Sequence, residues 1–329
     1  MGVAYRTCAK VEKMTQVRAS HRLTWLGYGA CAMAGCLWGT GFFFGKLALR
    51  EMSVGHMVLY RFLFATLGML PMMLTGRRSS GGREPAWTGR EKWILLLSAA
   101  LGIPIQFLLQ FEGLARTTVS HAALMVGTMP VLLALGATLF AGERLDWVGW
   151  LALAGSTVGA GLIVLGGHEA GVAGVAPSLG GDMLVVLSLT IALGWILMNK
   201  SLMRSHSPLA VTAYGILAGT LMLAAWVVTV DGPPPVARVS LTAWLALAAS
   251  GVLCTATTTL LWNWGIHHVP ASRAGVFLNI EPALGSLLGV ELLGDKLGPF
   301  AWVGGGLILA AAVTLTTRGH EFNPEVLLE

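Results

Sequence analysis

Apolar stretches about as long as a membrane is thick recur along almost the whole chain, and this feature restricts the fold more than any other. A helix needs about 20 largely apolar residues to cross the hydrocarbon core of a bilayer. Of the 329 residues, 55% are hydrophobic and only 11% are charged, which differs strongly from the composition of a soluble domain. The sequence therefore predicts an all-α integral membrane protein.

The apolar stretches predict ten membrane-spanning helices. Their expected ranges are 25–49, 54–75, 92–111, 119–140, 147–166, 182–203, 208–230, 242–264, 272–293 and 300–317. The first stretch follows a basic tail but is too long for a signal peptide, and nine further stretches follow it. We therefore interpret it as a retained helix of a multi-pass protein.

The segment Gly113–Trp150 occurs a second time, without a gap, as Gly265–Trp302. Nine positions are identical at a constant offset of 152 residues, including a glycine, a proline and a tryptophan. Both copies close with glycine, an acid, a base and leucine, with Glu143-Arg144 in the first and Asp295-Lys296 in the second. A fixed self-similarity at this distance indicates a duplicated structural unit.

The duplication divides the chain into two repeats of five helices each. The expected boundaries are a basic tail 1–24, a first repeat 25–166, a linker 167–181, a second repeat 182–317 and a tail 318–329. Fifteen of the 21 lysines and arginines fall on one side of the ten spans, which predicts that both termini are cytoplasmic. With five helices in each repeat, the second enters from the opposite face, so we expect inverted repeats around a central cavity.

Several ordered motifs resemble the EamA branch of the drug/metabolite transporter superfamily over about residues 25–317. They are the run Leu37-Trp38-Gly39-Thr40, the triplet Tyr60-Arg61-Phe62 and the doubled block from proline to Gly-Glu-Arg-Leu. The second copy has Asp295-Lys296 where the family more often has Glu-Arg. The resemblance implies ten helices in two inverted repeats, a bacterial inner membrane and the export of small metabolites, with amino acids as the first choice.

Ionisable residues inside apolar helices are candidates for substrate contacts, because a charge in hydrocarbon costs about 2.5–3.5 kcal/mol on insertion scales. Arg61 is expected either to bind a substrate carboxylate or to form a structural pair. Glu281 precedes a proline, and is expected to bind an ammonium group or a proton, or to fill a polar gap as a neutral acid. His121 either titrates near neutral pH or has no role beyond a helix end.

Duplication selects a second set of candidates, because corresponding residues of two inverted repeats are expected to face each other. Gln106 and Gln110 share a helix face, and the offset of 152 relates them to Thr258 and Trp262. Polar groups on apolar helices need water, each other or a ligand. The residues predicted to bind substrate are Trp38, Tyr60, Gln106, Gln110, His121, Trp195, Thr258, Trp262, Asn263 and Asn279, with Arg61 and Glu281 as charge partners.

Missing motifs restrict the function. The chain contains no phosphate-binding loop and no recognisable nucleophile or metal motif, so we expect no enzyme, no cofactor and no metal. The basic residues lie between apolar stretches, which favours anionic lipid over nucleic acid as their partner. A monomer is compatible with the sequence, which leaves the oligomeric state open.

These observations predict a secondary transporter that exports small metabolites by alternating access, and the resemblance implies amino acids, including apolar and aromatic ones, as the first choice of substrate. A rival within the same class is an exporter of drugs or other metabolites. From another class, a lipid flippase or an integral-membrane lipid-modifying enzyme is the alternative.

Overall fold

The structure is a computed structural model that describes residues 2–79, 85–129, 131–132, 135, 147–166, 178–236, 239–269 and 274–318. All regular elements in these ranges are helical. Most of the fourth predicted span beyond residue 129, the linker up to residue 177 and the Glu143-Arg144 pair lie outside the described residues. The expectation of an all-α chain is confirmed for the described part.

Within the described ranges the first half contains seven helical segments and the second half eight. The first seven are α1 (Gly2–Ala48), α2 (Val54–Ser79), α3 (Gly89–Ala100), η1 (Leu101–Ile105), α4 (Gln106–Ala115), α5 (Val119–Val126) and α7 (Trp147–Gly166). The second half has α8 (Leu179–Leu202), α9 (Pro208–Val230), α10 (Leu241–Gly251), η2 (Val252–Thr257), α11 (Thr258–His268), η3 (Gly275–Asn279), α13 (Ile280–Leu293) and α14 (Pro299–Arg318).

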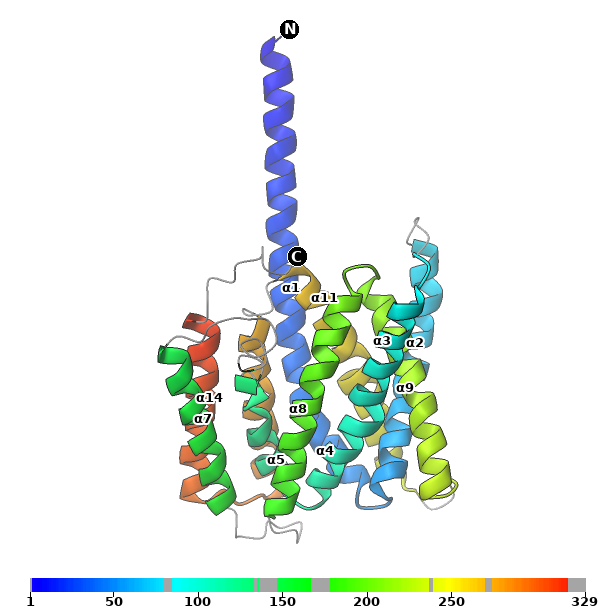
Figure 1. Cartoon of the computed structure of the whole chain (residues 1–329), viewed down its shortest axis with the longest axis vertical. Coiled ribbons are helices and arrows are strands. Elements are labelled where there is room, and N and C mark those ends of the chain that lie inside the picture. The colour runs from blue at the N-terminus through cyan, green and yellow to red at the C-terminus, as the bar shows by residue number, and fades with distance from the viewer. Residues whose placement is uncertain are drawn as a thin grey trace.

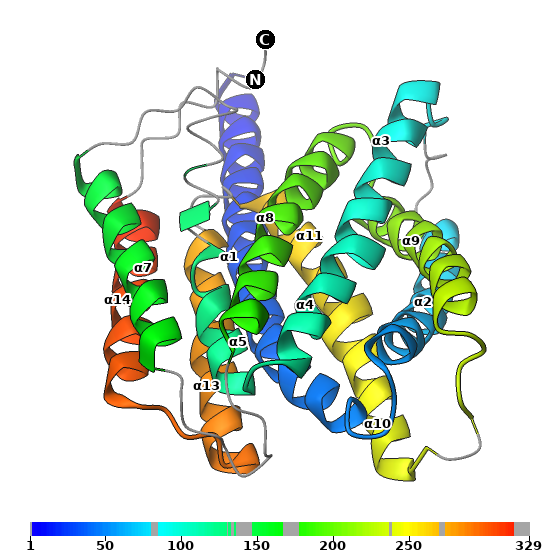
Figure 2. The same cartoon turned by 60° about the horizontal axis from the view of Figure 1, so that its bottom comes forward.

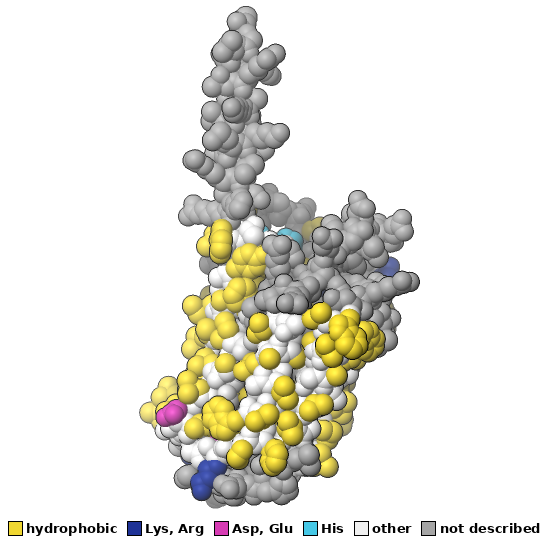
Figure 3. Space-filling model, turned by 90° about the vertical axis from the view of Figure 1, so that its left-hand side faces the viewer, with side chains coloured by type: hydrophobic (Ala, Val, Ile, Leu, Met, Phe, Trp, Pro, Cys, Tyr) yellow, Lys and Arg dark blue, Asp and Glu magenta, His cyan; other side chains and the backbone are white. Residues whose placement is uncertain are grey.

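In the part of the chain that the structure describes, five helical rods are long and apolar enough to cross a membrane. They are Val54–Met72, Gly89–Ala115, Leu179–Leu202, Pro208–Val230 and Leu241–His268, and two shorter apolar helices cover Trp147–Ile163 and Pro299–Ala311. Figure 3 shows hydrophobic side chains over most of the described surface on one side of the bundle, as a surface in contact with lipid requires. Trp25, Trp93 and Trp147 are exposed, which agrees with positions against lipid.

α1 and α8 run in opposite directions through the bundle. The last turn of α1 reaches the end of α4, because Lys46 Nζ donates hydrogen bonds to the carbonyl oxygens of Leu114 and Thr117. The first residues of α8 lie at the same place, because Ser178 Oγ donates to the carbonyl oxygen of Arg116. We call this the distal end of the bundle, since the N-terminal part of α1 projects from the opposite, proximal end (Figure 1).

Three pairs of corresponding helices in the two halves begin 152 residues apart, as the sequence repeat predicts. α10 begins 152 residues after α3, α11 begins 152 residues after α4, and α14 matches α7 at both of its ends. The wide π-helical turn η1 likewise has its counterpart in η2. The duplication therefore extends from sequence to local backbone geometry.

The two π turns have different local causes. η1 contains Pro104, which has no backbone N–H to donate to the preceding turn. In η2 the hydroxyl groups of Thr255 and Thr258 donate instead to the carbonyl oxygens five residues earlier, those of Ser250 and Leu253. Such widened turns frequently occur at functional sites, and here they interrupt one rod in each half.

The repeated glycines Gly113 and Gly265 permit equivalent close contacts between the halves. A Cβ atom on Gly113 would lie 2.7 Å from the carbonyl oxygen of Gly181 in α8, and one on Gly265 would lie 3.0 Å from that of Gly27 in α1. Inside a membrane no hydrophobic effect drives helices together, and small residues favour helix contacts because they let the backbones approach closely. The α4–α8 and α11–α1 contacts are thus two copies of one packing solution, while α7 and α14 pair at one edge (Figures 1 and 2).

Gly113→Ala and Gly265→Ala are each expected to lower the melting temperature of the purified protein. The added methyl group meets a backbone carbonyl that cannot move aside easily, and overpacking of this kind costs about 1–3 kcal/mol. Gly155→Ala is the matched control, because a Cβ atom there meets no atom within 4 Å. If the three variants melted alike in a fluorescence-detected thermal ramp, the glycine contacts would not hold the halves together.

Candidate functional site: a central cavity between the halves

A cavity lies between the two halves and, together with its mouth, contains about 950 Å³ of atom-free space. Its wall is formed by α1, α2, η1, α4 and α5 from the first half and by α8, α9, η2, α11, η3 and α13 from the second. Both π turns contribute, with Gly102 and Ile103 from η1 and their counterparts Cys254 and Thr255 from η2. The cavity therefore lies at the interface of the duplicated units.

Arg61 in the first half of α2 is the buried cation of the cavity. Its Nε donates to Thr255 Oγ1 at 2.7 Å, and Nη2 donates to the carbonyl oxygen of Cys254 at 3.3 Å. The guanidinium carbon also lies 5.0 and 5.1 Å from the ring centroids of Phe107 and Phe111, within the range of cation–π attraction. These contacts fix the guanidinium against η2, while Nη1 makes no hydrogen bond to a described residue.

Glu281 in the first turn of α13 supplies a carboxyl group to the same cavity. It acts electrostatically on Arg61, but the two groups form no direct ion pair within the described residues. Arg61 belongs to the first half and Glu281 to the second. A positive and a negative group therefore line one space without neutralising each other by contact.

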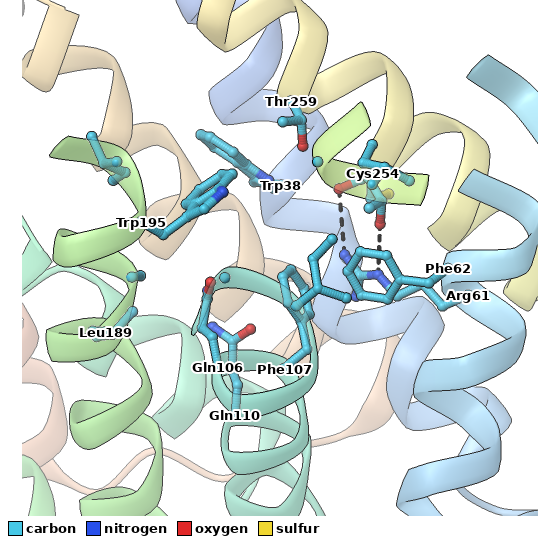
Figure 4. A pocket seen from close by; sticks show the side chains of 18 of the residues that line it. Trp38, Arg61, Phe62, Gln106, Phe107, Gln110, Leu189, Trp195, Cys254 and Thr259 are labelled. Atoms are coloured by element: carbon cyan, nitrogen blue, oxygen red, sulfur yellow. Dashed lines mark hydrogen bonds between the residues drawn. The ribbon is translucent and has the colours of Figure 1, made fainter. Parts of the chain in front are cut away.

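Amides and indoles form the remaining polar wall. In Figure 4, Gln106 and Gln110 rise from α4 toward the space below Trp38 and Trp195, which come from α1 and α8. Both amides are buried, and Gln106 Oε1 has no hydrogen-bond partner among the described residues. Six of the twelve predicted residues therefore line the cavity: Trp38, Arg61, Gln106, Gln110, Trp195 and Glu281.

Tyr60 and His121 lie toward the distal end and do not line the cavity. The Tyr60 hydroxyl donates to the carbonyl oxygen of Pro235 at 2.9 Å, and its ring packs edge-on against Trp244. His121 Nδ1 lies 3.6 Å from Asp182 Oδ2 in a fully buried position. Both side chains are used in contacts with the second half.

Thr258 and Asn263 do not line the cavity, and both form hydrogen bonds within the bundle. Thr258 Oγ1 donates to the carbonyl oxygen of Leu253 within the π turn, at 2.6 Å. Asn263 Nδ2 donates to Thr212 Oγ1 at 2.7 Å and so connects α11 to α9. These two groups hold the wall together from behind.

Trp262 and Asn279 are buried behind the cavity wall with unsatisfied polar atoms. The Trp262 ring packs on that of Trp38 at a centroid distance of 5.4 Å, and its Nε1 has no partner among the described residues. Neither polar atom of the Asn279 side chain has such a partner. Trp262 therefore does not line the cavity itself and instead packs against Trp38, which does.

The structure adds cavity residues that the sequence did not single out. They are the aromatic pair Phe107 and Phe111, the hydroxyl-bearing Thr212, Thr255 and Thr259, and Cys254 and Asn199. The sequence repeat could have identified part of this set, because Phe107 and Thr259 are 152 residues apart and both line the cavity. Within the described residues, no group of three or more His, Cys, Asp or Glu side chains is arranged to hold a metal ion.

The model of the EamA-like transporter family matches residues 25–165 and, a second time, residues 179–317. The chain belongs to the EamA-like transporter family. The family resemblance read from the motifs is thereby confirmed, and so is the presence of two repeats. The EamA assignment identifies the cavity as one inside a membrane transporter.

Similar proteins extend over most of the EamA region. An uncharacterised transporter of Archaeoglobus fulgidus is 24% identical over 294 residues, which cover 88% of this chain and 97% of the relative. A probable terminal-alkyne amino-acid exporter of Streptantibioticus cattleyicolor is 26% identical over 242 residues, 72% of this chain and 77% of the relative. A crystal structure with 19% identity matches with a TM-score of 0.63 over 92% of this chain and 99% of its own, and so shares the fold.

Proposed function

We propose that this EamA transporter exports amino acids, including apolar and aromatic ones, across the bacterial inner membrane. The observation that carries the proposal is the cavity in which Arg61 and Glu281 face one space without direct pairing. An amino acid has a carboxylate and an ammonium group on one carbon, so it complements both. The amino-acid exporter among the similar proteins supports the same substrate class.

The substrate carboxylate is proposed to bind Arg61, whose Nη1 has no hydrogen-bond partner among the described residues. The ammonium group is proposed to bind Glu281 and the amide oxygen of Gln106. The side chain then lies against Trp38 and Trp195, which offer apolar ring faces. Few fixed charges and several adaptable groups favour loose, broad recognition.

Transport is proposed to proceed by alternating access of two inverted repeats, residues 25–166 and 182–317, joined by the linker 167–181 in a bundle of ten helices. The opposite directions of α1 and α8 and the constant offset between corresponding helices support the inversion. Sites of this kind lie where inverted repeats meet. The distribution of lysine and arginine supports cytoplasmic tails at 1–24 and 318–329, which makes the distal end periplasmic.

Reconstituted vesicles offered a panel of labelled amino acids provide the test. Flux of at least one apolar or aromatic amino acid is expected, with little flux of sugars or of lipids. If the whole panel stayed inert while drug-like cations crossed, the amino-acid proposal would be wrong and the rival exporter of drugs would replace it. Lipid scrambling in the same vesicles would favour the flippase alternative.

Gln106→Met is expected to reduce amino-acid flux about 2- to 12-fold at unchanged protein level, because a neutral hydrogen bond contributes about 0.5–1.5 kcal/mol. Methionine keeps the length of the side chain and removes its amide. Thr190→Val is the control, since Thr190 is exposed and bonds only to its own helix, at the carbonyl oxygen of Val186. Equal flux in all three proteins would exclude Gln106 from the site.

A further inference from the structure

Five buried polar side chains from both halves meet at the distal end of the bundle. They are Lys46 at the end of α1, Thr117 after α4, His121 in α5, Asp182 in α8 and Asp295 after α13. Figure 2 turns this end toward the viewer and shows α1, α4, α5 and α8 converging there, with α13 beside α5. We call these five residues the distal cluster.

Two contact sets join the halves within the cluster. Thr117 Oγ1 donates to Asp182 Oδ1 at 2.8 Å, and His121 lies beside the second oxygen of the same carboxylate. Lys46 Nζ lies 2.7 Å from the carbonyl oxygen of Thr117, so the ammonium group of α1 contacts the backbone of the residue whose hydroxyl binds Asp182. The carboxylate of Asp182 from the second half thus accepts a hydrogen bond from Thr117 of the first half and lies beside the imidazole of His121.

Asp295 makes the second contact set. Gly294 ends α13 with a φ of +67°, a left-handed conformation that suits glycine, and so turns the chain back toward α5. Asp295 Oδ2 then accepts a 2.9 Å hydrogen bond from the backbone N–H of Ser120, in the first turn of α5. A carboxylate at this position is favoured by the helix dipole, and it also attracts Lys46. The acid of the repeated Gly-acid-base-Leu motif therefore docks on the opposite half.

The cluster lies between the cavity and the distal surface. The cavity wall on α8 extends no closer to its start than Leu189, seven residues or about 10 Å along the helix from Asp182. The backbones beside the cluster are in contact, because a Cβ atom on Gly181 would lie 2.9 Å from the carbonyl oxygen of Arg116. The cluster and this backbone contact, which together we call the seam, therefore separate the cavity from the distal surface along α8.

We infer that the distal cluster is the latch that closes the substrate cavity at the distal end and is broken each time the cavity opens there. The inference rests on the proposed transport function. Charged groups suit a reversible seal, because water solvates them when the seam opens and so offsets the contacts that are lost. An apolar seam of the same size would gain no such solvation and would favour the closed state.

Labelling of a reporter cysteine tests the latch without any substrate. The reporter is Leu189→Cys, with the native cysteines replaced by alanine, in proteoliposomes sorted for orientation by protease access to the N-terminal tail. A membrane-impermeant thiosulfonate is added from the distal side. Lys46→Met and Asp182→Asn are each expected to increase the labelling rate at least about tenfold, since the first leaves two carbonyl oxygens without their donor and the second removes the carboxylate charge of the cluster.

Arg116→Gln is the matched control. Arg116 lies at the same end but pairs with Glu112 of its own helix on the exposed surface. Its replacement is expected to leave the labelling rate unchanged. If Lys46→Met and Asp182→Asn are labelled at the parent rate and elute as folded protein in size-exclusion chromatography, the latch proposal is wrong. Loss of amino-acid flux alone would contradict only the substrate proposal.

A disulfide cross-link provides a second test of the latch if the charge variants do not fold. In a chain without other cysteines, Thr117→Cys with Asp182→Cys replaces the direct contact by a disulfide. Oxidation is expected to reduce the exchange flux of a transported amino acid at least about tenfold, and reduction of the disulfide is expected to restore it. Full flux in protein verified as cross-linked would show that the seam stays closed during transport and would overturn the latch.

Discussion

Replacing Arg61 by glutamine is expected to lower amino-acid flux at least about 100-fold, because two charge-assisted hydrogen bonds to the carboxylate, each about 1.5–3 kcal/mol, are lost. The loss is expected mainly in binding, so the concentration for half-maximal flux rises before the maximal rate falls. Flux in vesicles and equilibrium binding by scintillation proximity measure the two effects.

A structural role of Arg61 predicts a different result. The guanidinium also holds η2 through Thr255 and the carbonyl oxygen of Cys254, so its removal can loosen the wall. Thr255→Val removes that support and leaves the cation in place. If Thr255→Val lost as much flux as Arg61→Gln and melted at an equally low temperature, Arg61 would support the wall and would not bind substrate.

Glu281→Gln is expected to lower amino-acid flux about 10- to 150-fold, the range of one charged hydrogen bond. The change keeps the shape of the side chain and removes its negative charge, which is the partner proposed for the ammonium group. Flux of an aromatic amino acid in matched vesicles of parent and variant measures the effect.

Substrate analogues separate the two charge partners. The carboxylic acid that lacks the amino group should lose no flux from Glu281→Gln, and the amine that lacks the carboxylate should lose none from Arg61→Gln. A variant that reduced the flux of all three compounds equally would contradict recognition of the zwitterion. Such an outcome would leave Glu281 either as a proton carrier or as a structural acid.

The membrane fold could be predicted from the sequence because its signal is strong at two scales. Apolar length identifies the spans, and the 152-residue offset predicts where corresponding helices begin, as α7 and α14 show at both ends. The sequence contains less information about the N-terminal tail 1–24. Helix α1 begins at Gly2, well before the first apolar stretch, and no proline interrupts the residues between.

The cavity could be predicted only in part, because an offset fixes position along a helix and not the face that points inward. Gln106 lines the cavity while its counterpart Thr258 does not, and the facing pairs are Phe107 with Thr259 and Ile103 with Thr255. Charges were the better guide, since a buried charge needs a cavity or a partner. Arg61 and Glu281 line the cavity, whereas His121 lies beside Asp182 at the distal end.

The two wide turns have a consequence for the history of the chain. A widened turn arises from one inserted residue, which shifts every later side chain around its helix, and here both rods carry it at the same place. Two independent insertions at equivalent positions, stabilised by proline in one copy and by hydroxyl groups in the other, are the less economical explanation. A widened turn that was present before the duplication explains both copies with a single insertion, and both walls of the cavity then have the same helix contour.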